Sequence, residues 1–441
     1  MLKFIFYLIF MTLFCFFDMY IFYLISFFFF FFFFFFFFFF YDYIFFSISY
    51  GFMIDSVSFI FCCLLFWVMI LVFISLISNI YFDFNFFSFF LLLHFFLIFL
   101  FFDFLVVDFF YFYFFFECSL VPLFLIIFGW GIQPERLMAG FFLIFFTLVG
   151  SFPFLLIILY VYEVFGGFHF FFFYFFSNYY LMFFIIISFM VKFPLFGLHF
   201  WLPKAHVEAP TVGSMILAGI MLKLGGYGLI RSCFFLYYFI YDYGYFFFGI
   251  CLYGCVLVGF FCLIQVDLSS LVAYSSVCHM SLVICGLLSM SFFGYFGSLM
   301  FMISHGFVSS GLFFLIGLVY DRLGSRSFFI LSGLMNYLPS LSFFWFLFCV
   351  LNMSCPPSLG LFSEICLVIS ILNWSFYSLI FFFFILFFSG CYSIMIFSFT
   401  QHGLFSSSLL LLNVCFVRDF LILVLHFFPL FFVVFDVNLF F

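Results

Sequence analysis

The sequence predicts an all-α, polytopic membrane protein with about fourteen transmembrane helices. Of its 441 residues, 71% are apolar and 6% are charged, whereas a soluble domain has roughly a quarter of its residues charged. A spanning helix needs about 20 mainly apolar residues, and only short polar breaks interrupt this chain. In lipid the backbone must satisfy its own hydrogen bonds, so each apolar segment is expected to be helical.

The individual helices are predicted from apolar windows that end at Gly, Pro, Asn or charged residues. Their boundaries are least sharp near the N-terminus, where a run of phenylalanines at 27–40 indicates a codon or genome bias. The predicted helices cover residues 2–17, 21–41, 56–80, 84–102, 105–130, 137–162, 180–202, 211–235, 244–264, 268–290, 292–320, 338–373, 376–399 and 420–435.

Two of these segments contain prolines that predict broken helices. The seventh contains Pro194, which cannot donate to the Met190 carbonyl, and the twelfth is too long for one straight helix and contains Pro356 and Pro357. Interrupted helices at membrane depth usually line a cavity or a site.

Several classes of function lack their sequence signals. A net charge of -7 without a clustered basic stripe predicts no nucleic-acid partner. None of the 15 cysteines forms a C-x-x-C pair, so we expect neither a metal site nor an iron–sulfur cluster. There is no glycine-rich nucleotide loop, so we expect no cofactor on this chain. The N-terminus resembles neither a signal nor a transit peptide.

Four charged residues are predicted to lie inside membrane helices: Glu117, Lys192, Lys223 and Glu364. Placing one charge at the centre of a helix in lipid costs about 2.5 to 3.5 kcal/mol. One explanation is an ion pair that only fixes helix packing. The other is a proton relay: at about 7 Å and an effective dielectric of about 20, Glu117 and Lys192 would interact by about 2.4 kcal/mol, so that breaking the pair could release a proton.

Histidines offer further stations because the imidazole titrates near neutrality. His305 lies deep in an apolar segment and is the best relay candidate, followed by His279. His199 and His206 could equally cap the exit of the seventh helix. Taken singly, each histidine is more often a satisfied hydrogen-bonding residue. Gly225, Gly226 and Gly228 follow Lys223, and we expect them to let a neighbouring backbone approach.

Five strings between residues 105 and 373 carry a resemblance to a known family. The most specific is VKFPLFGLHFWLPKAHVEAP at 191–210. The others are GWGIQPERL at 129–137, LKLGGYGLIR at 222–231, AYSSVCHM at 273–280 and PPSLGLFSE at 356–364. At these residues the chain closely resembles the chain 4 family of mitochondrial NADH:ubiquinone oxidoreductase, the antiporter-like membrane subunits of respiratory complex I.

The resemblance implies two inverted five-helix repeats with broken seventh and twelfth helices. It implies a proton-translocating subunit without its own redox site, in which Glu117 pairs with Lys192, Lys223 is the central lysine, His279 and His305 are relay positions, and Glu364 is the terminal acid. The expected divisions are a Phe-rich N-terminal part at 1–103, antiporter-like halves at 104–243 and 244–400, and a C-terminal helix at 401–441.

The same resemblance implies which subunits and cofactors accompany the chain and in which membrane it lies. NAD, FMN, iron–sulfur clusters and ubiquinone are expected on partner subunits, and sister antiporter-like chains are expected as neighbours in the mitochondrial inner membrane. The codon bias and the absence of targeting favour an organelle-encoded chain. Two alternatives stay open: a stand-alone cation/proton antiporter subunit and a structural membrane scaffold, although a scaffold could replace its buried charges by apolar residues.

Overall fold

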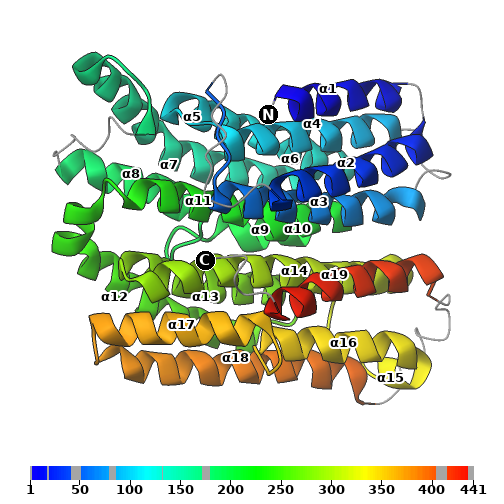
Figure 1. Cartoon of the computed structure of the whole chain (residues 1–441). Helices are drawn as coiled ribbons and strands as arrows, with labels where there is room; N and C mark the ends of the chain where they lie inside the picture. Colours follow the sequence, from blue (N-terminus) through cyan, green and yellow to red (C-terminus); the bar gives the residue numbers. More distant parts are fainter. Residues whose placement is uncertain are drawn as a thin grey trace. The chain divides into compact units, whose positions relative to one another are not determined.

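The computed structural model in Figure 1 describes residues 2–16, 19–40, 51–78, 86–131, 133–170, 179–403 and 415–435. Within these ranges every regular element is a helix, and the extended backbone is limited to three isolated bridges. This confirms the predicted all-α class. The chain divides into two compact units, Met1–Phe189 and Met190–Phe441, which we describe separately.

The first unit consists of apolar helices rich in phenylalanine. Their cohesion includes one buried polar contact: His94 on α4 lies 2.7 Å from the Tyr23 hydroxyl on α2 and 3.2 Å from the Leu8 carbonyl on α1. The helices are α1 Leu2–Phe16, α2 Tyr20–Phe40, α3 Ser56–Ser75, η1 Leu76–Ser78, α4 Phe86–Leu105, α5 Phe109–Cys118, α6 Leu120–Trp130, α7 Arg136–Phe165 and most of α8 Tyr179–Lys192.

The second unit holds the remaining helices. In it α12 packs against α13 and α18, while α14 packs against α13, α17 and α19. The helices are α9 Trp201–Glu208, α10 Thr211–Ile216, η3 Leu217–Met221, α11 Leu222–Cys233, α12 Tyr237–Ile264, α13 Leu268–Leu288, α14 Phe292–Leu323, α15 Leu334–Tyr337, α16 Pro339–Asn352, α17 Leu359–Trp374, α18 Ser378–Gln401 and α19 Val417–Phe435.

The predicted helix boundaries agree with these elements to within a few residues, with three larger differences. The seventh segment, predicted to end at residue 202, continues after its break as α9 to Glu208. The fifth segment starts at Phe109 instead of residue 105, because Asp108 occupies the N-cap and contacts His169. The ninth starts at Tyr237, seven residues before its predicted start. The predicted ends at residues 17, 41 and 80 and the predicted start at 84 lie outside the described residues.

By length and composition, ten of the described helices could cross a membrane, and four shorter apolar helices accompany them. These elements fit a polytopic membrane protein. The inverted repeats and the four-part domain division stay predictions.

Both predicted helix breaks are present. After Lys192 the chain leaves the helix, and the Met190 carbonyl accepts a hydrogen bond from the Leu195 amide at 3.1 Å, one residue beyond Pro194. The Met190 carbonyl therefore loses its helical donor at residue 194 but accepts from the next amide instead. In the twelfth segment, residues 353–358 separate α16 from α17, and both halves pack along α18 (Figure 1).

The eighth segment contains a feature that hydropathy did not predict. Residues Leu217–Met221 form a π-helical turn directly before Lys223. Such turns widen the helix and often occur at functional sites. Here the turn lies inside a segment whose apolar window is entirely buried.

Candidate functional site

Lys223 is the central charged residue of the second unit. Its side chain is fully buried on α11. The ammonium donates to the Ala218 carbonyl within the π-helical turn, and it lies 3.1 Å from Nδ1 of His305 on α14. When Lys223 is protonated its ammonium has only donors, so that Nδ1 of His305 would accept and the hydrogen of a neutral imidazole would reside on Nε2.

The glycines after Lys223 pack differently from the prediction. A Cβ at Gly226 would lie 2.3 Å from Sδ of Met302 and 3.0 Å from the Phe193 ring. The close neighbours of Gly226 are therefore side chains, and the expectation of an approaching backbone was wrong at this position. Because Gly226 has no side chain, Met302 can pack directly against α11.

A second histidine continues the polar contacts away from Lys223. The ring centroids of His305 and His279, on α13, are 5.8 Å apart. Nε2 of His279 lies 2.8 Å from the hydroxyl of Tyr392 on α18, which is fully buried. Sequence reasoning missed Tyr392, because a tyrosine within an apolar segment has no signal that separates it from core aromatics.

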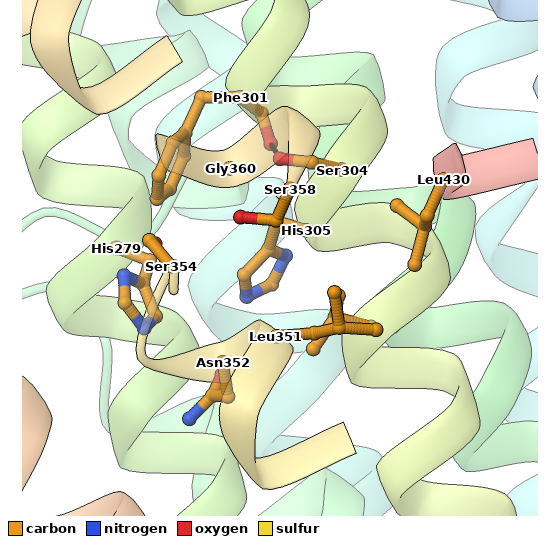
Figure 2. A pocket seen from close by; sticks show the side chains of 11 residues that line it. His279, Phe301, Ser304, His305, Leu351, Asn352, Ser354, Ser358, Gly360 and Leu430 are labelled. Atoms are coloured by element: carbon orange, nitrogen blue, oxygen red, sulfur yellow. Dashed lines mark hydrogen bonds between the residues drawn. The ribbon is translucent and has the colours of Figure 1, made fainter. Parts of the chain in front are cut away.

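A small cavity with a volume of about 20 Å³ lies beside the two histidines. Figure 2 shows the lining side chains, which come from α13, α14, α16, the break after α16, and α19. This volume suits a single water molecule, which needs about 10 to 15 Å³ and two to four polar partners, and histidine, serine and asparagine side chains are among the lining residues. The lining residues are His279, Phe301, Ser304, His305, Val308, Leu351, Asn352, Ser354, Ser358, Gly360 and Leu430.

Glu364 lies on α17 next to this cavity but does not line it. Its Oε1 accepts a hydrogen bond of 2.6 Å from the Ser354 hydroxyl in the break between α16 and α17. Glu364 is partly exposed on the isolated chain, and its predicted place as a charge buried in the membrane stays a prediction. Hydropathy places a residue at a depth in the membrane but does not show which face of its helix is covered.

Glu117 and Lys192 belong to different units. Lys192 is the last residue of α8 and is buried. Glu117 lies one residue before the end of α5, and both of its carboxylate oxygens are buried although the residue is partly exposed. The predicted Glu117–Lys192 pair joins the two units and stays a prediction.

The two remaining predicted histidines lie just before α9 and inside it. Nδ1 of His199 accepts from the Gly197 amide at 3.2 Å, which favours a local structural role. His206 is buried on α9 and stacks on Phe313 of α14, with 4.3 Å between ring centroids. Neither contact links them to the cavity.

No group of three or more His, Cys, Asp or Glu side chains in the described part of the chain could hold a metal ion. The polar contacts beside the cavity are pairs of lysine with imidazole, imidazole with phenol, and hydroxyl with carboxylate. Each pair can exchange a proton through a hydrogen bond.

Comparison with known proteins identifies the family. The family model described as NADH:quinone oxidoreductase/Mrp antiporter, TM, matches residues 106–390. The chain is 46% identical over 321 residues to NADH-ubiquinone oxidoreductase chain 4 of Locusta migratoria, covering 71% of each protein. It is 43% identical over 390 residues to the chain 4 of Ceratitis capitata, covering 88% of this chain and 87% of that protein.

Solved structures show the same fold. A chain of respiratory complex I from Thermus thermophilus with bound NADH superimposes with a TM-score of 0.77 at 21% identity, over 88% of this chain and 84% of that chain. A chain of an archaeal membrane-bound sulfane sulfur reductase gives a TM-score of 0.78 at 19% identity, over 86% and 64%. The chain therefore belongs to the antiporter-like family of NADH:quinone oxidoreductase and Mrp membrane proteins, among the NADH-ubiquinone oxidoreductase chain 4 proteins.

Proposed function

We propose that this chain translocates protons as a membrane subunit of NADH:ubiquinone oxidoreductase. The observation that carries the proposal is the Lys223–His305 contact of 3.1 Å inside membrane helices, beside a small cavity that both His279 and His305 line. A hydrogen-bonded amine and imidazole can pass a proton between them with little movement of heavy atoms. A scaffold would have no use for either group at this depth.

The proposed step starts with a protonated Lys223 and a neutral His305. Transfer of one proton from Nζ to Nδ1 makes His305 an imidazolium, which can release its other proton from Nε2. Two positive charges on Lys223 and His305 would repel each other at 3.1 Å, so protonation of one group disfavours the charged form of the other. A proton that enters at Lys223 therefore favours release from His305.

The energy must come from outside this chain in the proposed mechanism. Moving one charge against 100 mV costs about 2.3 kcal/mol. We assign NADH oxidation and ubiquinone reduction, with NAD, FMN and the iron–sulfur clusters, to partner subunits. We also place the complex in the mitochondrial inner membrane and its sister antiporter-like chains beside this one, as the eukaryotic relatives suggest.

The alternative of a stand-alone cation/proton antiporter is supported by the breadth of the family model, whose description includes Mrp antiporters. The relatives at 43% and 46% identity are all oxidoreductase chains, which favours the first proposal.

The variant Lys223→Met tests the proposal. It keeps a long apolar side chain but removes the titrating amine, so we expect the complex to assemble and proton flux to fall by about 100-fold or more. Proton flux and quinone reductase rate are measured in reconstituted vesicles. Lys3→Met, at an exposed lysine near the N-terminus, is the matched control. An assembled Lys223→Met complex that pumps at the normal rate would disprove the role of Lys223.

A further inference from the structure

The break between α16 and α17 places one hydroxyl between the cavity and Glu364. Ser354 lines the cavity together with His279 and His305, as Figure 2 shows. The same hydroxyl donates to Oε1 of Glu364 at 2.6 Å, and Glu364 itself does not line the cavity. Ser354 is therefore the side chain on this side of the cavity that contacts both.

The backbone at Ser354 has an uncommon conformation for a residue with a side chain. Its φ angle is +56°, in the left-handed region that favours glycine. Its amide donates to the Leu351 carbonyl at 3.1 Å, so the turn is satisfied without the hydroxyl. The turn alone would be served better by glycine, and the presence of serine indicates that the hydroxyl has a role of its own.

A glycine in α17 leaves space for this hydroxyl. A Cβ at Gly360 would lie 3.2 Å from Oγ of Ser354, which is a tight contact. Any larger residue at 360 would press on the Ser354–Glu364 hydrogen bond. Two features of the break, the serine in a left-handed turn and the glycine opposite it, thus favour the same contact.

We propose that the Ser354 hydroxyl carries protons between Glu364 and the cavity. This inference rests on the proposed proton-translocating function and names the connection to its terminal acid. When the Glu364 carboxylate is charged, the Ser354 proton passes to Oε1 while Oγ accepts a proton from a water molecule in the cavity, and that water takes the proton released from Nε2 of the His305 imidazolium, which becomes neutral. The hydroxyl is restored, the carboxyl becomes neutral, and no electrons are transferred. The reverse sequence returns the proton.

The test compares Ser354→Ala and Ser354→Gly in the assembled complex. Both remove the hydroxyl, but only glycine suits the left-handed backbone. If the hydroxyl matters, both variants lose proton flux by a similar factor of about ten, the value expected for one hydrogen bond to a charged group. If only the turn conformation matters, the glycine variant pumps at least as well as the wild type, and the proposal is overturned. Ser363→Ala, next to Glu364 but bonded to the Gly360 carbonyl, is the control.

A second measurement separates this contact from a structural effect. The carbonyl stretching band of protonated Glu364 is assigned by infrared difference spectroscopy as the band that Glu364→Gln lacks. Loss of the Ser354 hydrogen bond is expected to move this band to higher frequency in Ser354→Ala and to leave it in place in Ser363→Ala. An unmoved band in Ser354→Ala overturns the proposal.

Parallel assays of Lys223→Met distinguish the two levels of inference. If Lys223→Met abolishes pumping while both Ser354 variants pump normally, the role of Ser354 is wrong and the proposed function holds. If Lys223→Met pumps normally, the proposed function itself fails.

Discussion

At Lys223 one ammonium group contacts two neutral acceptors, the Ala218 carbonyl and the His305 imidazole. Neither acceptor neutralises the charge, so the lysine is solvated by dipoles in a region that has little water. The strength of this solvation depends on the π-helical turn that presents the carbonyl and on the rotamer of His305. The π-helical turn and the His305 rotamer are therefore expected to influence how strongly the amine of Lys223 holds its proton.

His305→Ala is expected to slow proton flux less than Lys223→Met does. The truncated side chain opens space next to the cavity, and water can replace a hydrogen-bonding group there more readily than a fixed charge. Quinone reductase and proton flux rates of the two variants, compared at matched protein content, provide the check. A defect in His305→Ala equal to that of Lys223→Met would show that the imidazole is an obligatory carrier.

Glu117 is expected to act through its charge. Glu117→Gln keeps the length of the side chain but removes the charge, and Glu117→Asp keeps the charge on a shorter arm. If Glu117 sets the proton affinity of Lys192, the Asp variant retains part of the pumping and the Gln variant loses it. Proton flux in reconstituted vesicles measures both, and a Gln variant that pumps better than the Asp variant would refute the assignment.

The residues of the site could be predicted from the sequence only in part. Charges such as Lys223 stand out because apolar residues surround them, and prolines at 356 and 357 marked the break that holds Ser354. The partners could not be predicted, because contacts such as His279–Tyr392 join positions 113 residues apart. Nothing in the local sequence separates Tyr392 from the other 26 tyrosines, of 27 in all.

At the scale of elements, hydropathy located the helices well but not their irregularities. The π-helical turn at Leu217–Met221 has the same apolar composition as an ordinary helix, so no local signal marks it. The start of the fifth segment was missed because residues 105–107 are as apolar as the helix that follows Asp108. Breaks were predicted where proline removes a backbone donor, since that effect is local.

One glycine of α12 is expected to control how this helix packs. A Cβ at Gly254 would lie 2.3 Å from Cβ of Phe196, close to the backbone and unable to rotate away, whereas nothing lies within 4 Å of a Cβ at Gly249. Alanine in a helix is intrinsically favoured over glycine by about 1 kcal/mol, and overpacking costs about 1 to 3 kcal/mol.

We therefore expect Gly254→Ala to lower the thermal stability of the complex and Gly249→Ala to leave it equal or slightly higher. Thermal unfolding of the detergent-solubilised complex, followed by the loss of assembled material, compares the two. Equal stability of both variants would show that the segment around Phe196 shifts to accommodate the methyl group.

At the scale of the molecule, the second unit has its less apolar helices inside. The windows of Thr211–Cys233, α13 and α14 have mean hydropathies of 1.5, 1.9 and 1.8 and are 94% to 100% buried, whereas α12 and α18 reach 2.5 and 2.4 and are 50% and 39% buried. Lipid accepts apolar surface without penalty, so polar groups gather where protein covers them. In the first unit α3 departs from this pattern, with a hydropathy of 3.0 and 78% burial.

The outer surface of the whole chain is expected to meet both lipid and partner subunits. Isolation under mild conditions should recover this chain together with flavoprotein and iron–sulfur subunits of NADH dehydrogenase, identified by mass spectrometry. Recovery with antiporter subunits alone, and without redox subunits, would instead support the stand-alone antiporter.

The break between α16 and α17 also has an electromechanical consequence. The end of α16 at Asn352 and the first turn of α17 at Gly360 line the same cavity as His305. A helix carries roughly half a negative charge at its C-terminus and half a positive charge at its N-terminus. A proton on His305 is therefore attracted by the C-terminal end of α16 and repelled by the N-terminal end of α17. Charging the imidazole is expected to push these two helix ends in opposite directions. A change in the relative position of these two helix ends is therefore expected to change the electrostatic energy of a proton on His305 in return.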